Sequence, residues 1–149
     1  MQWPLREPRY AEACPVVDGW SSFESYEPVK SKAAGRKAIL PRLRVLVGKD
    51  IALGPGKVEL LAFVHKTGSI GEAAKAMGMS YMRAWVLIKT MQRCFKKPLV
   101  HPVRGGAGGG GAELTETGRA ALALYQQMDN ACLKATRQQW LKLQRLLRS

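Results

Sequence analysis

The chain has 149 residues, 46% of them hydrophobic, and a formal net charge of +13, which suits one small domain with an additional arm. No apolar stretch is long enough to cross a bilayer and no signal-peptide pattern opens the chain, so we expect a cytoplasmic protein. Three scattered cysteines exclude a disulfide framework and offer no metal-ligand spacing, while the large positive charge points to nucleic acid or another anionic surface.

Nothing in the sequence favours catalysis. His65 and His101 stand alone, and we find no nucleophile–base pair, no paired carboxylates in a plausible site and no cofactor fingerprint. We therefore expect neither an enzyme nor a bound metal or cofactor.

Residues 1–40 combine four prolines with isolated aromatic residues and show no sustained period. They are interpreted as a poorly ordered N-terminal arm that docks through Trp3, Trp20 or Phe23. Residues 42–48 alternate as in one short strand, and Pro55 suits the start of a helix that covers residues 57–66.

The next two helices have clear start and stop signals. Ser69 can cap a short helix, and Glu72 completes a capping box. Gly78 ends this helix, and Ser80 can cap a third helix that runs to about Phe95. In the third helix four residues share an apolar face: Ala84, Ile88, Met91 and Phe95.

A glycine-rich stretch, residues 105–111, separates two short β-prone segments, residues 99–103 and 112–114. It could be a flexible linker, a phosphate-binding loop or the tip of a hairpin. A phosphate-binding loop requires Lys and Ser/Thr after the last glycine, but Ala112 and Glu113 stand there. Thr115 with Gly118 then opens a helix without a proline up to Ser149.

This last helix, residues 119–149 with its first turn, would be about 50 Å long if unbroken. Its apolar residues are spaced alternately by four and three, and the pattern slips by one residue before Trp140. The seam consists of Ala121, Tyr125, Met128, Cys132 and Ala135. A domain this small cannot cover the whole seam, so we expect a partner chain.

Helix, short helix, tight turn, helix and hairpin is the order of a winged helix-turn-helix, a mainly α fold with a small β-wing. We assign residues 41–118 to this domain and residues 119–149 to a dimer contact. Residues 41–98 carry eleven Lys or Arg and three acids, a net +8, which favours a DNA-binding role over a three-helix core without one.

The segments TGSIGEAAKAMGMSYMRAW, PLV and GGAGGGGAELTETG together resemble the N-terminal DNA-binding domain of the ModE family of molybdate-dependent transcriptional regulators, a relative of the LysR-type helix-turn-helix. The resemblance covers about residues 41–130. It implies a dimer that binds a palindromic operator in double-stranded DNA, with a link to molybdate transport or metabolism, and it makes the glycine run the wing tip.

Two departures from the family pattern matter. ModE proteins carry a C-terminal molybdate-binding domain for which 149 residues leave no room, so we do not expect this polypeptide alone to bind molybdate. The family's wing also carries basic residues where this sequence has Pro102 and Ala107. Only Arg104 remains basic, so the wing should add less electrostatic affinity.

Eight residues are predicted to contact DNA. Arg83 either reads a guanine through O6 and N7 or pairs with a phosphate, and Trp85 either touches DNA or packs under the wing. Ser69 lies at a helix N-terminus, which favours anions. The full set is Ser69, Ser80, Tyr81, Met82, Arg83, Trp85, Lys89 and Arg104.

A second hypothesis belongs to a different class: a protein-interaction or dimerisation module that works with a separate effector-binding subunit. The absent sensor domain and the low charge of the wing favour it. An RNA or membrane-surface binder ranks third, because the cations are spread over a compact fold and no aromatic stacking platform is evident.

Overall fold

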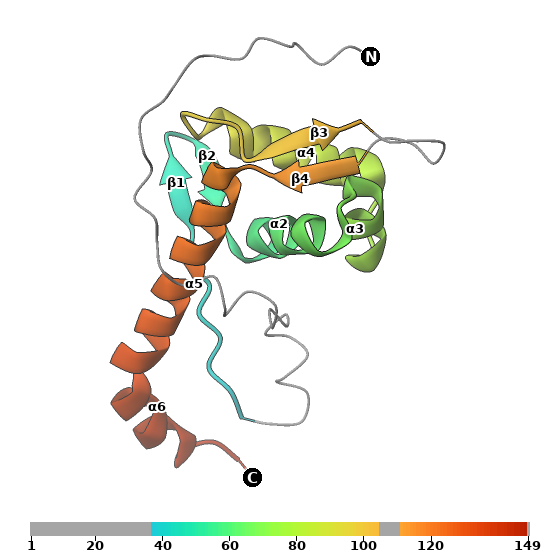
Figure 1. Cartoon of the computed structure of the whole chain (residues 1–149). Helices are drawn as coiled ribbons and strands as arrows, with labels where there is room; N and C mark the ends of the chain where they lie inside the picture. Colours follow the sequence, from blue (N-terminus) through green and yellow to red (C-terminus); the bar gives the residue numbers. More distant parts are fainter. Residues whose placement is uncertain (1–36, 105–110, 149) are drawn as a thin grey trace.

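The computed structural model describes residues 37–104 and 111–148. Its elements in chain order are β1 (Val45–Val47), β2 (Asp50–Leu53), α2 (Pro55–Thr67), α3 (Ile70–Ala76), α4 (Tyr81–Arg93), β3 (Val100–Val103), β4 (Gly111–Leu114), α5 (Glu116–Ala135) and α6 (Arg137–Gln144). Helices α2, α3 and α4 form a compact group with the β3–β4 hairpin against it, and α5 leads away toward α6 (Figure 1). The expected winged helix-turn-helix followed by a helix is confirmed. Most of the predicted arm, residues 1–36, and the glycines at 105–110 lie outside the described residues.

Local signals set the helix ends. Pro55 occupies the first turn of α2, and Gly68 ends it in the left-handed conformation at φ 64°. Ser69 Oγ accepts a hydrogen bond from the Glu72 amide at 3.3 Å, as expected for the cap of α3. Only this half of the capping box forms, because the Ser69 amide donates to Thr67 Oγ1.

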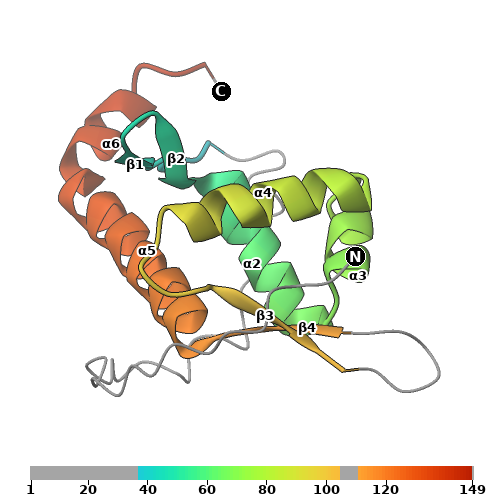
Figure 2. The same cartoon turned by 90° about the horizontal axis from the view of Figure 1, so that it is seen from above.

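One hydrophobic core joins the helices to the wing and to α5. The interior of α2 supplies Leu60, Leu61 and Val64, all fully buried. The wing adds Leu99 and Leu114, and the remaining buried side chains of the cluster include Ala73, Ala74, Ala84, Met91, Leu122 and Tyr125. Small residues on α3 allow it to lie close against α2 and α4 (Figure 2). Cys94 and Cys132 are half-buried free cysteines.

A second strand pairs with the single strand expected at residues 42–48, which is a correction. Strand β2 pairs antiparallel with β1 through a two-residue turn, in which Gly48 adopts φ +59°. A glycine in a two-residue loop is a hairpin signal, so Gly48 marks this turn in the sequence.

The wing has the expected pairing. Strands β3 and β4 are antiparallel, with Val100 opposite Leu114 and Val103 opposite Gly111. Thr115 connects the wing to α5. Its amide donates to Leu99 O at 2.9 Å, and its Oγ1 accepts from the Gly118 amide at 3.0 Å.

The C-terminal region is not one helix, contrary to expectation. Helix α5 ends at Ala135, and Thr136 lies at φ −94° and ψ 2° before α6 begins. Thr136 Oγ1 donates to Cys132 O at 2.7 Å, a back-bond that bends helices. The break falls where the apolar pattern slips by one residue.

Candidate nucleic-acid interface

Helix α4 has one face in the core and one face exposed at the surface. It packs against α3 through Ala84, which is fully buried, and the tight turn before it contains Gly78 at φ 64°. Ser80 Oγ accepts from the Arg83 amide at 3.3 Å and so caps the helix. The N-terminal turn of α4 therefore starts at the surface, in a defined orientation.

The outer face of α4 combines cations with apolar side chains. Tyr81 is 54% exposed and Met82 62% exposed. Arg83, Lys89 and Arg93 add three cations, and α4 contains no acidic residue. Arg93 is partly engaged, because its guanidinium lies 3.8 Å from the Asp50 carboxylate. Exposed apolar residues on a basic helix suit base edges, which present both methyl groups and hydrogen-bonding atoms.

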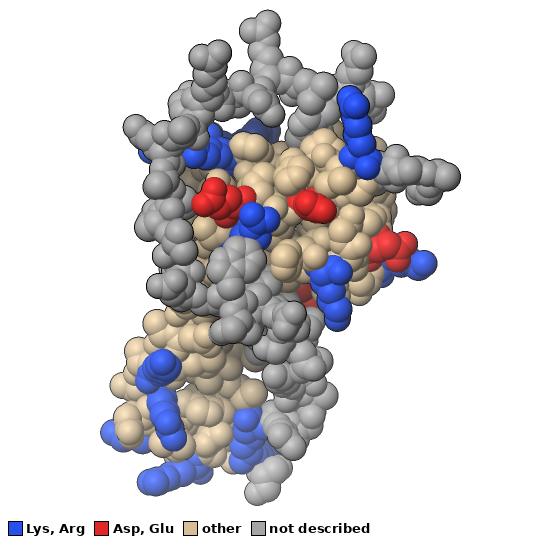
Figure 3. Space-filling view, viewed as in Figure 1, with Lys and Arg blue, Asp and Glu red and all other residues tan. Residues whose placement is uncertain are grey.

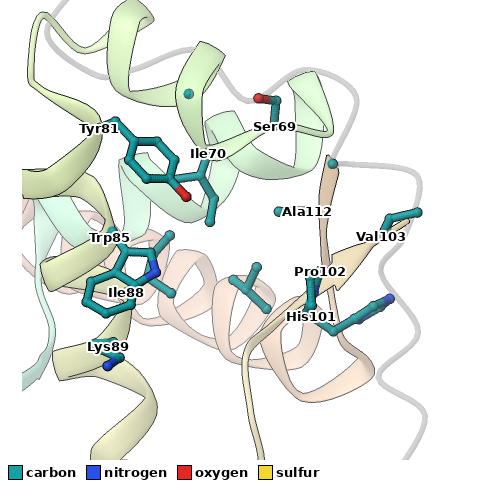
Figure 4. A pocket seen from close by; sticks show the side chains of 13 residues that line it. Ser69, Ile70, Tyr81, Trp85, Ile88, Lys89, His101, Pro102, Val103 and Ala112 are labelled. Atoms are coloured by element: carbon teal, nitrogen blue, oxygen red, sulfur yellow. The ribbon is translucent and has the colours of Figure 1, made fainter. Parts of the chain in front are cut away.

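A groove of about 330 Å³ runs between α4, the start of α3 and the wing. Tyr81, Trp85 and Lys89 line it on the α4 side, while His101 and Pro102 line the opposite side (Figure 4). Lys89 Nζ lies 4.0 Å from the centroid of the Trp85 ring, a cation–π contact that holds both side chains along the groove. Trp85 thus packs in the groove beside the wing.

Backbone contacts hold the wing at one position relative to the helices. The Ala112 amide donates to Gly68 O at 2.8 Å, which joins β4 to the turn between α2 and α3. Gln92 Oε1 accepts from the Val100 amide at 3.1 Å, which joins the last turn of α4 to β3. A Cβ at Gly111 would lie 2.8 Å from Gly68 O, so the approach requires glycine there.

Ser69 caps the N-terminus of α3, which forms one end of the groove. Its Oγ accepts from the Glu72 amide, which leaves its hydroxyl hydrogen free to donate. Glu72 is exposed in the same first turn, so a carboxylate stands beside the site that was predicted to bind a phosphate. This negative charge opposes the binding of a phosphate at Ser69.

The groove brings together four of the eight predicted residues: Ser69, Tyr81, Trp85 and Lys89. Ser80, Met82 and Arg83 are exposed at the N-terminal end of α4 outside the groove lining, and Arg104 is exposed directly after β3. The tip of the wing, including Ala107, lies outside the described residues.

The sequence interpretation missed the wing side of the groove. His101 is exposed and lines the groove, with its Nε2 3.9 Å from Glu113 Oε2 across the two strands. Alternation along β3 could have placed His101 and Val103 on one face. Packing buries Val100 on the opposite face, and the position of the hairpin beside α4 brings His101 and Val103 into the groove lining.

The described part of the chain contains neither a cluster of metal-binding side chains nor a membrane-spanning helix. Residues 37–104 and 111–148 contain no group of three His, Cys, Asp or Glu side chains that could hold a metal ion. No helix among them is both long and apolar enough to span a bilayer.

Comparison with known proteins agrees with this geometry. Residues 56–119 match the model of the lysR family of bacterial regulatory helix-turn-helix proteins. The molybdenum transport protein ModE of Azotobacter vinelandii is 38% identical over 90 residues, which cover 60% of this chain and 33% of that protein. The transcriptional regulator ModE of Yersinia pestis is 41% identical over 81 residues, 54% of this chain and 31% of that protein.

The DNA-binding transcriptional dual regulator ModE of Escherichia coli K12 is 38% identical over 81 residues, with the same coverage as the Yersinia protein. The chain thus spans about a third of the length of the curated relatives it matches. The family-model match, residues 56–119, covers the helix-turn-helix and its wing.

Proposed function

Because residues 56–119 form a helix-turn-helix domain of the LysR type with ModE homologues, we propose that this protein is a transcriptional regulator that binds double-stranded DNA sequence-specifically. It acts in the cytoplasm on a palindromic operator linked to molybdate transport or metabolism. The observation that carries the proposal is the capped, acid-free helix α4, exposed beside a wing that backbone hydrogen bonds hold in place.

Helix α4 and the wing make different kinds of contact with DNA in this proposal. Helix α4 offers side chains that can enter a major groove, with Tyr81, Met82 and Arg83 at its N-terminal end. The wing lies beside this end and Lys89 about two turns further along α4, and both face the neighbouring phosphates. Contacts to phosphates supply affinity, and the first turn of α4 supplies the sequence preference.

Dimerisation is part of the proposal, and the apolar surface of α5 that the described residues leave exposed supports it. Ala121 and Tyr125 of the expected seam are buried within the chain's own core. A neighbouring stripe remains outside that core with coiled-coil spacing: Leu124, Met128, Ala131 and Ala135. A second copy that covers this stripe would place two α4 helices on one face of a duplex, about 34 Å or a multiple apart.

The decisive experiment is selection of bound duplexes from a random library by the purified protein, with and without molybdate. We expect enrichment of a two-fold symmetric motif whose half-sites lie about one helical turn apart. Equal retention of all duplexes near physiological salt would reject sequence-specific regulation.

The alternative role is an interaction module for a separate effector-binding subunit, and the same free stripe on α5 favours it. Co-purification from a native lysate distinguishes the two roles. A stoichiometric heteromeric partner, together with no duplex binding, would support the module. A homodimer that selects one motif would support the regulator.

A further inference from the structure

The end of the molecule that carries α6 presents cations and leucines without any acid. Residues 130–148 contain no Asp or Glu, and their five cations are Lys134, Arg137, Lys142, Arg145 and Arg148. Lys and Arg side chains are visible there in Figure 3, with no acidic side chain beside them on that face. Leu143 and Leu147 are exposed, and Leu146 is 81% exposed. We call this the α6 surface.

Such a surface fits an occupant that is both acidic and apolar, because leucines favour removal from water and clustered cations favour nearby carboxylates. A second α6 surface does not meet this requirement. It would set five cations against five like charges. Nor does α6 join the DNA-facing groove, since it lies beyond α5, away from α4 and the wing (Figure 1).

The chain itself contains a segment with the required chemistry. Residues 18–27 read DGWSSFESYE, with three carboxylates, three aromatic side chains and no Lys or Arg. The aromatic residues recur every third position, as Trp20, Phe23 and Tyr26. This segment lies in the part of the chain that precedes the described residues.

The described chain also begins beside the α6 surface. Lys37 Nζ donates to Leu147 O at 3.2 Å, so residue 37 lies next to the turn that follows α6. The ten residues from Glu27 to Lys37 can reach up to about 33–36 Å when extended. Because the eight residues of α6 are only about 12 Å long, the acidic segment can reach all of α6.

We propose that residues 18–27 dock on the α6 surface of the same chain, with their aromatic rings against the leucines and their carboxylates beside the cations. The inference does not depend on DNA binding, and its failure would leave the proposed regulator intact. Its consequence is that the α6 surface is shielded within the protomer from other polyanions.

Photo-crosslinking within the full-length protein tests this contact. Benzoylphenylalanine replaces Phe23, and the products of irradiation are separated by mass and mapped by peptide mass spectrometry. We expect products of monomer mass in which the probe at position 23 is cross-linked to a residue within the range 137–148. The same probe in place of Tyr10, outside the acidic segment, is the matched control and should give at least about threefold less of this product.

Charge neutralisation in the arm makes the test specific. Asp18→Asn, Glu24→Gln and Glu27→Gln together should lower the cross-link yield at least about threefold, since each carboxylate–cation pair contributes modestly. Glu7→Gln with Glu12→Gln, nearer the N-terminus, should leave the yield unchanged. Equal urea unfolding of the two variants checks that neither set of changes alters the fold.

Several results would overturn the proposal. Cross-links on α4 or the wing would place the segment at the DNA-facing groove, and products of dimer mass would make a second copy the acceptor. A cross-link yield at or below that of the Tyr10 control would contradict the docking contact. So would a yield that is unchanged when the three carboxylates are neutralised.

Discussion

Arg83 stands in the first turn of α4, where its side chain is exposed and its amide is fixed by the Ser80 cap. If it reads a guanine, Arg83→Ala should reduce the preference for operator over unrelated duplex by about 1–3 kcal/mol. Competitive titrations with both duplexes measure that preference directly.

Lys89→Ala is the matched comparison for Arg83. Lys89 lies along the groove over the Trp85 ring, where a phosphate contact is expected. Its loss should weaken operator and unrelated duplex by similar factors, because phosphates carry no sequence information. An Arg83→Ala protein that behaves like Lys89→Ala would assign Arg83 to a phosphate.

Gly118 occupies the first turn of α5, against the end of the loop that enters the wing. A Cβ there would lie 2.0 Å from Leu99 O, so backbone must move to admit any side chain. Gly118→Ala should lower the free energy of unfolding by about 1–3 kcal/mol or more through this clash. Urea denaturation followed by circular dichroism gives the difference.

Gly56 is the control for the substitution at Gly118, because it also lies in the first turn of a helix. A Cβ at Gly56 would meet no atom within 4 Å. Gly56→Ala should be neutral or stabilise by up to about 1 kcal/mol, since alanine favours helix. Equal effects of the two substitutions would contradict the steric explanation.

Asp129 is a half-buried acid on α5. Burial raises its pKa above the ordinary value of 3.8, and its Oδ1 accepts no hydrogen bond within the described residues. Because the folded pKa is raised, folding is most favoured below the unfolded value and loses stability as pH rises through the folded pKa.

Asp129→Asn should therefore raise the free energy of unfolding at neutral pH, by less than about 1 kcal/mol because the carboxyl remains partly solvated. The gain should disappear near pH 3, where the Asp129 carboxyl of the unsubstituted protein is protonated in both the folded and the unfolded state. Unfolding curves at several pH values test the sign. A gain that stays constant with pH would mean that the charge is not its cause.

At the scale of elements, α5 serves two surfaces. Tyr125 faces inward, and its hydroxyl donates to Leu43 O at 2.7 Å, whereas Leu124 and Met128 face out. Leu124→Glu should convert the proposed dimer to a monomer without loss of stability, because a carboxylate would enter the contact between copies. Light scattering after size exclusion measures the mass.

Asn130→Glu provides the control for Leu124→Glu, because Asn130 is exposed on another side of α5. It adds the same charge outside the apolar stripe and should leave the dimer intact. A wild-type protein that is already monomeric at micromolar concentration would disprove the pairing through α5.

At the scale of the whole molecule, the net charge of +13 predicts strongly salt-dependent DNA binding. The logarithm of the association constant should fall by about 0.9 per neutralised phosphate for each unit of log salt. Isotherms at four or more salt concentrations give the slope. Affinity that is independent of salt would exclude a phosphate-dominated interface.

Local signals explain how much of this architecture could be predicted. Ser69, Ser80 and Thr115 cap their helices as expected, because a cap is formed within three residues of sequence. The wing pairing and the exposed face of α4 followed from periodicities of two and 3.6 residues. The fold class and the exposed helix α4 were therefore determined by the sequence alone.

The tertiary structure decided what depends on distant residues. It turned the apolar stripe at Tyr125 toward the core instead of toward a partner, where the Tyr125 hydroxyl donates to Leu43 O. It also placed His101 across a groove from Trp85. Periodicity shows that a residue lies on a face, but only packing selects which neighbour that face meets.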